Sequence, residues 1–289
     1  MRPHDDTPRP PIDDDHADGH HEHDLGLIHD LEVMDQRSRL RPPIPAALSR
    51  RRALGMIGGG AVAAVALAAC DAPAGQVTGG GCSIVPTETA GPYPGDGSNG
   101  PNVLNQSGVV RSDIRSSFGS YSGTAPGIKL NLRIVVRDVS GSCSNLVGAA
   151  VYAWHCTRDG AYSLYSSGHT SQNYLRGVQA TDSDGAVLFT TIFPGCYAGR
   201  WPHIHFEVFP SLASATSASN KILTSQIALP EAACRQVYAT SGYGTSLTNL
   251  NGVSLSSDGI FRDGVDHQMA AVGGNTTDGY IASLTVGTA

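Results

Sequence analysis

The chain has 289 residues, of which 40% are hydrophobic and 15% are charged, so it contains enough apolar material for a folded core. Its 35 glycines and 17 prolines favour many turns over long helices. The net charge of -6 comes largely from the N-terminal acidic run. The sequence indicates no basic face that would follow a phosphate backbone, which argues against a nucleic acid as a partner.

Residues 1–48 form an acidic leader that is rich in histidine and poor in large apolar residues. Such a segment buries too little surface to offset the entropy of ordering, which predicts disorder. Its histidines could bind a metal weakly, and the simpler interpretation is a solvated leader. The clustered histidines are His4, His16, His20, His21 and His23.

Residues 49–70 are predicted to be an export signal. Paired arginines at Arg50 and Arg51 precede an apolar run from 56 to 69, which is shorter than the about 20 residues that a membrane-spanning helix needs. This pattern is typical of a twin-arginine signal, and the Leu-Ala-Ala-Cys ending at Cys70 resembles a lipoprotein cleavage site. We expect export and a lipid anchor on Cys70 at the outer face of the cytoplasmic membrane. The alternative is an ordinary secretory signal, cleaved without lipid attachment.

Five cysteines follow the expected signal. If the chain is exported, they lie in an oxidising compartment where disulfides persist. The simplest expectation is two bridges and one free thiol. Cys143 and Cys156 flank an apolar run that, as a strand, would hold them too far apart to bridge directly. The five are Cys82, Cys143, Cys156, Cys196 and Cys234.

Residues 71–81 are predicted to be a flexible linker, and residues 82–289 a single domain. The domain should begin with an ordered loop over 82–105 that carries Tyr93. One helix is expected near 230–238, and a polar loop over 240–251. Alternating apolar residues and glycine-rich turns predict an all-β sandwich. Its strands are expected at 128–136, 147–155, 204–209, 222–229 and 279–287, with a hairpin over 174–193 that turns at 182–185.

The segment 199–208 reads GRWPHIHFEV and places two histidines on an expected strand. Because successive side chains of a strand point to opposite faces, His203 and His205 share one face, and Ile204 and Phe206 share the other. Imidazole suits zinc, copper, iron and nickel alike. The same spacing also fits a pair of surface or hydrogen-bonding histidines.

Nearby tyrosines narrow the choice of metal. Tyr197 lies shortly before the histidines, and Tyr162 and Tyr165 lie further upstream. A phenol, whose pKa is about 10, loses its proton only to a strong Lewis acid. Two phenolates with two imidazoles are the hard, anionic set of ligands expected for ferric iron.

Three segments, in this order, resemble the intradiol ring-cleavage dioxygenases, the family of catechol and protocatechuate dioxygenases, and especially its secreted single-domain branch. They read GAAVYAWHCTRDGAYS, RGVQATDSDGAVLFTTIFPGCY and GRWPHIHFEVF. The resemblance implies a Fe(III) site, with Tyr165 as the runner-up for its first tyrosine. The implied iron ligands are Tyr162, Tyr197, His203 and His205.

The resemblance further implies cleavage of catechol-type rings by O2, between the two hydroxyl-bearing carbons, to muconate-type diacids. Tyr197 would then be catalytic as well, by taking a substrate proton. Arg200 would stabilise negative charge on the ring, the alternative being a salt-bridged arginine at the start of the strand. Gln226 matches the family's active-site glutamine, unless it makes only sheet hydrogen bonds.

Two other functions compete with this interpretation. One is a non-catalytic, lipid-anchored β-sandwich that binds catechol–iron chelates or a protein partner. The other is a zinc hydrolase that uses His203 and His205, which would leave the tyrosines unexplained because zinc seldom recruits phenolates.

Overall fold

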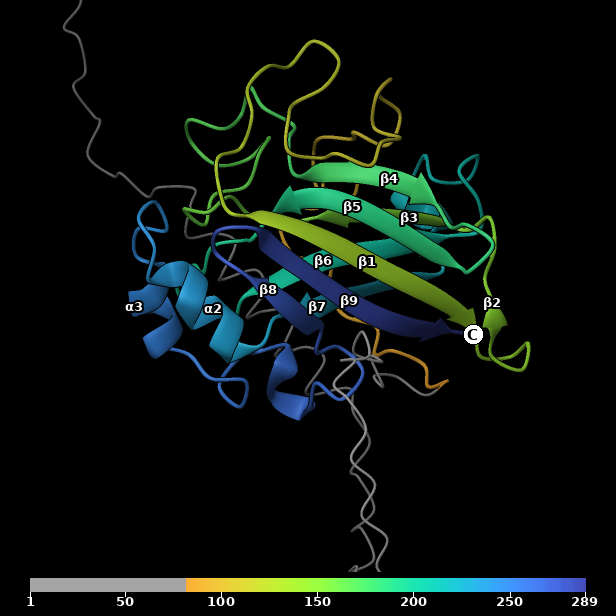
Figure 1. The fold of residues 1–289 in the computed structure, drawn as a ribbon. Helices are drawn as coiled ribbons and strands as arrows, with labels where there is room; N and C mark the ends of the chain where they lie inside the picture. The colour runs from red at the N-terminus through yellow and green to blue at the C-terminus, as the bar shows by residue number, and fades with distance from the viewer. Residues whose placement is uncertain (1–81) are drawn as a thin grey trace, which may run out of the picture.

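The computed structural model describes residues 82–289 of the chain. The expected leader, export signal, lipid-anchor site and linker, at 1–81, lie outside the described residues. Within the described part, two packed β-sheets with a few short helices confirm the predicted sandwich (Figure 1).

One sheet has five strands. These are β1 (Lys129–Asp138), β2 (Ser144–Asn145), β5 (Ala186–Ile192), β8 (Ala271–Asn275) and β9 (Gly279–Thr288). Strand β1 pairs in parallel with β9, and antiparallel with β5 and β2. The sheet is therefore mixed, and its first strand lies beside its last.

The second sheet has four antiparallel strands in the order β4-β3-β6-β7. They are β4 (Arg176–Ala180), β3 (Ala150–Trp154), β6 (His203–Phe209) and β7 (Leu223–Ala228). The helices α2 (Glu231–Tyr238) and α3 (Ser246–Asn251) lie together at one end of the sandwich, away from the C-terminus (Figure 1). Two 3-10 turns, η2 (Ala218–Asn220) and η3 (Phe261–Asp263), complete the described elements.

The core forms between the two sheets, where alternation along the strands directs apolar side chains inward. Leu130 and Leu132 of β1 are fully buried, while Asn131 between them is partly exposed. Ile204 and Phe206 of β6 belong to the same buried cluster. Each such side chain contributes about 1.5–3 kcal/mol on burial. Because β6 directs these residues into the core, its histidines must face the opposite side of the sheet.

The predicted hairpin over 174–193 is wrong, although both of its strands exist. Strand β4 pairs with β3 and strand β5 pairs with β1, so the turn at 182–185 carries the chain from one sheet to the other. The segment 109–114 lies along the edges of β4 and β5 that would have paired with each other in a hairpin. Val178 exchanges backbone hydrogen bonds with Val109 and Arg111, and Thr190 does so with the same segment.

The expected helix at 230–238 is confirmed as α2, whereas the expected loop at 240–251 is wrong because it contains α3. Tertiary contacts hold this short helix against the loop at Cys196. The Ser246 hydroxyl accepts a hydrogen bond from the Cys196 amide at 3.0 Å, and the Asn249 amide donates to the Cys196 carbonyl at 2.8 Å. None of the helices in residues 82–289 is long and apolar enough to cross a membrane.

One disulfide is present in the described domain, between Cys82 and Cys143. It joins residues 61 apart in the sequence. In the chain-entropy model, closing a loop of this length stabilises the folded state by about 4 kcal/mol. The expected two bridges are wrong, because Cys156, Cys196 and Cys234 are buried free thiols. Burial raises the pKa of Cys156 and Cys196 to about 12, which keeps both thiols protonated and unreactive. The expectation that Cys143 and Cys156 do not pair is confirmed.

Candidate metal centre

Four side chains from three segments bring their ligand atoms to one place on the outer face of the second sheet. The Tyr162 hydroxyl lies 3.3 Å from Nε2 of His205, and the Tyr197 hydroxyl lies 3.2 Å from Nε2 of His203. The two Nε2 atoms are 3.1 Å apart. The structure therefore brings together the four residues that the sequence singled out.

Strand β6 supplies the histidines and two loops supply the tyrosines. Both histidines are nearly fully buried, unlike a surface pair, because loops cover the outer face of the sheet. The two tyrosine loops touch at Gly160, where an added Cβ would lie 3.0 Å from Cβ of Tyr197. Gly160 also has a φ of 88°, a conformation that favours glycine. This close approach lets Tyr162 and Tyr197 converge on the histidines.

The structure separates the two tyrosines that the sequence left as alternatives. Tyr162 is 2% exposed and directs its hydroxyl to His205. Tyr165 directs its hydroxyl to the loop at 95–99, where it accepts from the Gly95 amide at 2.9 Å and donates to the Asn99 carbonyl at 3.0 Å. Tyr165 thus supports the covering loop, and Tyr162 lies with the histidines.

Burial determines the protonation of the cluster. It lowers the pKa of His203 to about 3, with the charge of Arg200 adding to the effect, and lowers the pKa of His205 well below its ordinary value. Both imidazoles are therefore neutral at neutral pH. Burial, followed by the proximity of Tyr197, raises the pKa of Tyr162 well above its ordinary value. The phenol will ionise only if a strongly polarising cation binds beside it.

The arrangement of the ring nitrogens fits a bound metal ion. Nδ1 of His203 lies 2.5 Å from the Trp201 carbonyl, so this nitrogen carries the proton and Nε2 presents a lone pair. Ligand atoms about 2.1 Å from a shared ion lie roughly 3 Å apart, which matches the observed spacings. Among residues 82–289, no group of three or more histidine, cysteine, aspartate or glutamate side chains could hold a metal ion. The candidate centre depends on phenol oxygens instead.

Arg200 lies beside the cluster, and its side chain is only 1% exposed. Its Nε donates to Oδ2 of Asp258 at 3.0 Å, and its Nη2 donates to Oε1 of Gln226 at 2.6 Å. The salt bridge considered from the sequence therefore exists. It holds a cation close enough to lower the pKa of both histidines.

Gln226 lies on β7, directly across from His205 in the strand register. Its amide oxygen accepts from Arg200, and its amide nitrogen donates to the Thr89 carbonyl at 3.0 Å. Both ends of the side chain are thus engaged, and Gln226 links Arg200 to the loop that leads to Tyr93. It does more than make sheet hydrogen bonds.

Two aromatic residues that the sequence noted lie next to the ligands. The Tyr93 ring lies 5.0 Å from the Tyr162 ring, on the loop that covers the sheet. Trp154, fully buried on β3, stacks on His205 with ring centroids 4.8 Å apart and an 8° angle between the planes. Tyr93 therefore borders the site, and Trp154 fixes the plane of one imidazole.

Sequence reasoning missed two residues that hold this site. Asp258 comes from a serine- and glycine-rich stretch that predicts only a turn, and nothing there indicates a partner for Arg200. Arg176 is buried at the start of β4 and donates to the carbonyls of Tyr93, Pro94 and Ser163. It therefore ties the covering loop to the loop of Tyr162. A buried arginine cannot be recognised from the alternating pattern of a strand.

Comparison with known proteins finds similar sequences and a similar fold. Residues 99–203 match the sequence model of a family described as Dioxygenase, a range that includes Tyr162, Tyr197 and His203. A chlorocatechol 1,2-dioxygenase from Rhodococcus opacus is 38% identical over 72 residues. That alignment covers 25% of this chain and 27% of the relative, so the chain spans about a quarter of the length of the curated relative it matches.

The fold has a counterpart among solved structures. An intradiol ring-cleavage dioxygenase from Tetranychus urticae superposes with a TM-score of 0.56 at 24% identity, over 72% of this chain and 94% of that one. The chain therefore resembles the intradiol ring-cleavage dioxygenases in fold, and part of its sequence, residues 99–203, matches the Dioxygenase family model.

Proposed function

We propose that this protein is an exported, non-haem Fe(III) dioxygenase that cleaves catechol-type rings between the two hydroxyl-bearing carbons. The products would be muconate-type diacids. The observation that carries the proposal is the convergence of two phenol oxygens and two imidazole nitrogens, with neighbouring atoms 3.1–3.3 Å apart, in a buried site beside a fixed arginine.

Tyr162, Tyr197, His203 and His205 would hold the iron. When bound, Fe(III) supplies a Lewis acid that ionises the phenols and binds the catechol for its reaction with O2. The neutral imidazoles need no deprotonation to serve as ligands, because burial already keeps both rings uncharged. Trp154 and the Trp201 carbonyl keep the rings oriented, so that little reorganisation accompanies binding.

Tyr197 is the better placed of the two tyrosines to exchange a proton with the substrate. Its side chain is only half buried, and the next two residues along its loop are exposed, whereas Tyr162 is enclosed. A catechol must lose two protons to bind as a dianion. The phenolate oxygen of Tyr197 would accept one of them, and hydroxide would accept the other. Tyr162 would remain among the residues that hold the iron.

Arg200 supplies the positive charge that the reaction needs. As oxygen attacks the ring, negative charge grows on the substrate, and a buried guanidinium stabilises such charge more strongly than water does. Its contacts with Asp258 and Gln226 hold it in place before substrate arrives.

The test of this function is the colour and chemistry of the purified protein. Iron-loaded protein should absorb visible light through charge transfer from tyrosinate to Fe(III), and should consume one O2 for each catechol. Labelled O2 should place both of its oxygen atoms in the diacid. A colourless protein that is fully occupied by zinc and inactive on catechols would contradict the proposal and favour a hydrolase.

A non-catalytic binder of catechol–iron chelates remains the second candidate. The buried tyrosines oppose it, since a protein that captures a preformed chelate has no need to supply phenolate ligands of its own. The two candidates differ in one measurement. A binder would release the catechol unchanged after incubation with O2.

Export is supported by the signal-like segment at 49–70 and by the disulfide between Cys82 and Cys143, a bond typical of oxidising compartments. Replacing Arg50 and Arg51 with lysine is expected to trap the precursor in the cytoplasm, because the twin-arginine route reads the paired arginines. Cell fractionation would measure this. Unimpaired export of the variant would contradict the assigned route, and an unlipidated Cys70 in the mass spectrum would contradict the lipid anchor.

A further inference from the structure

Asp258 is a buried carboxylate, far from Arg200 in the sequence, and it is fully engaged in hydrogen bonds. Oδ2 accepts from Nε of Arg200 at 3.0 Å and from the Trp201 amide at 2.7 Å. Oδ1 accepts from the amides of Ile260 and Phe261 at 2.8 and 3.0 Å. Each oxygen thus has two donors, and the carboxylate itself is fixed by the backbone of its own loop.

The pair with Arg200 is a buried ion pair, with exposures of 1% and 0% for the two side chains. Removing two charges from water is unfavourable unless their geometry is good and their remaining hydrogen bonds are satisfied. Asp258 meets that condition. Burial opposes its ionisation, yet the charge of Arg200 and the Trp201 amide hold the pKa of Asp258 below its ordinary value.

The contacts of Arg200 show what Asp258 determines. A guanidinium is planar, so a contact at Nε and another at Nη2 fix both its position and its plane. Asp258 provides the first contact and Gln226 the second. Gln226 is neutral and is itself held by Thr89, so Asp258 is the charged anchor of the two.

Asp258 also contacts the backbone of Trp201, which lies between Arg200 and the first histidine. It accepts from the Trp201 amide, and the carbonyl of the same residue lies 2.5 Å from Nδ1 of His203. The Phe261 ring, on the loop that Asp258 caps, lies edge-on to the His203 ring at 6.5 Å. One carboxylate therefore orients the cation directly and supports a candidate iron ligand through the backbone.

We propose that Asp258 is a positioning residue for the ring-cleavage reaction. It fixes the Arg200 guanidinium in the orientation that stabilises charge on the substrate. This inference rests on the proposed function. It adds a residue that acts through Arg200 and does not itself touch the substrate. Its loss should lower the rate of the chemical step and leave substrate binding largely intact.

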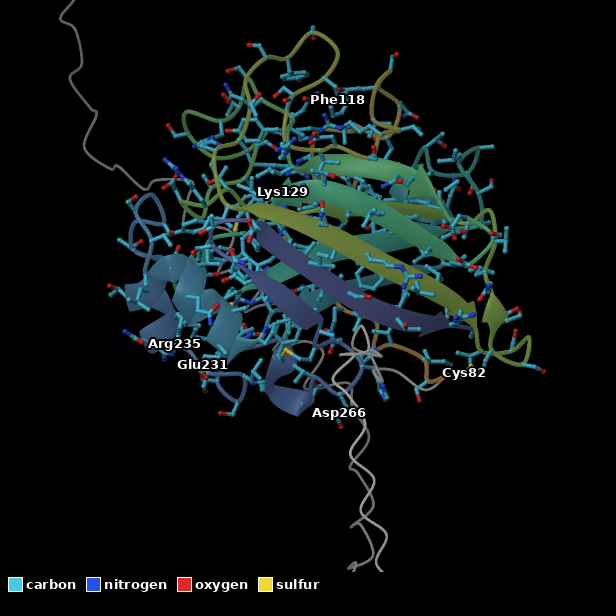
Figure 2. All side chains as sticks on the ribbon, in the orientation of Figure 1. Cys82, Phe118, Lys129, Glu231, Arg235 and Asp266 are labelled. Atoms are coloured by element: carbon cyan, nitrogen blue, oxygen red, sulfur yellow. A yellow bond between two sulfur atoms is a disulfide. The ribbon has the colours of Figure 1, made fainter. Side chains whose placement is uncertain are left out.

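A double-mutant cycle tests this inference. The variants are Asp258→Asn, Arg200→Gln and the double variant, with Asp266→Asn as the matched control. Asp266 undergoes the same chemical change in the same part of the chain, but it is exposed at the surface (Figure 2). Turnover and KM with catechol are measured on iron-loaded protein, and the side-chain Nε–H resonances of arginine are recorded by NMR on metal-free protein.

The expected result is that Asp258→Asn lowers kcat only when Arg200 is present. Asp258→Asn should lower kcat at least tenfold with less than a threefold change in KM, and Asp266→Asn should leave both unchanged. In the Arg200→Gln background, Asp258→Asn should change kcat by less than twofold, because the group it positions is already absent. Losses that multiply in the double variant would show a general structural role and overturn the inference.

The NMR measurement does not depend on catalysis. The Nε–H signal that disappears in Arg200→Gln should be shifted and slow to exchange in the wild type, and should lose both properties in Asp258→Asn. An Asp258→Asn protein with an unchanged signal would overturn the inference about Asp258 and leave the proposed function standing. Wild-type protein that keeps this signal but cleaves no catechol would instead overturn the proposed function, and the catalytic role of Asp258 with it.

A second comparison covers the case in which Asp258→Asn does not fold, since it leaves a buried arginine without its counter-charge. The double variant carries neither charge and should fold better than Asp258→Asn. Its kcat is then compared with that of Arg200→Gln. Equal values support the inference, and a lower value in the double variant contradicts it.

Discussion

Tyr162→Phe protein is expected to bind iron on the order of 100-fold more weakly than the wild type, and to lose ring cleavage with it. Loss of a residue that merely supports a ligand already lowers metal affinity about 10–100-fold, so loss of the ligand itself should reach at least the upper limit. The reason lies in the geometry of the site. Tyr162 is the enclosed phenol, and its hydroxyl lies 3.3 Å from Nε2 of His205.

Iron content per chain and visible absorption measure this result, and Tyr165→Phe is its matched control. Tyr165 lies three residues further along the same loop, but its hydroxyl binds the backbone of Gly95 and Asn99. The control should therefore keep its iron and its colour. A Tyr165→Phe protein that loses its iron, beside a Tyr162→Phe protein that keeps its iron, would show that the ligand is Tyr165.

The same measurement on Tyr197→Phe should give a different pattern. Tyr197 is also a proposed ligand, so this variant should be compared at iron concentrations that saturate the site. It should then keep a charge-transfer band from Tyr162, and its turnover should fall about 10²- to 10⁴-fold, the range typical of a lost general base. Unchanged turnover would remove Tyr197 from proton transfer.

Arg200→Gln protein is expected to keep its iron and its colour, while its turnover falls on the order of 10²–10³-fold. That range is typical when a fixed group that stabilises charge in the transition state is removed. The variant also leaves Asp258 buried without its cation, which costs roughly 3–5 kcal/mol. Thermal unfolding should be measured beside the kinetics, and turnover should be compared well below the lower melting temperature.

Arg262→Gln is the control for this prediction. Arg262 belongs to the short turn η3 that follows Asp258, and its side chain is exposed, so removing its charge should change neither turnover nor stability appreciably. Wild-type turnover in Arg200→Gln protein would contradict a catalytic role and would show that Arg200 serves only in a structural ion pair with Asp258.

Much of the sandwich could be predicted because its strands alternate apolar and polar residues. Strands β1, β7 and β9 and helix α2 form close to where the sequence predicts them. Strand β8 was missed because its residues, Ala-Val-Gly-Gly-Asn, show no alternation, and it forms only by pairing with β9. The hairpin failed for a related reason. A local pattern identifies strands, but it does not identify the neighbour that completes their hydrogen bonds.

The sequence by itself determined which face of β6 the histidines occupy, because side chains of a strand alternate regardless of what surrounds it. It also led to the proposal of ferric iron, since phenols and imidazoles have the same ligand chemistry in any fold. Only the tertiary structure showed that the Tyr162 hydroxyl points to the histidines and the Tyr165 hydroxyl to the covering loop, because a loop's side chains point where its packing directs them. Only the tertiary structure brought Asp258 to Arg200, across 57 residues of intervening chain. Contacts between such distant segments depend on how the whole domain packs, and no local pattern of residues records them.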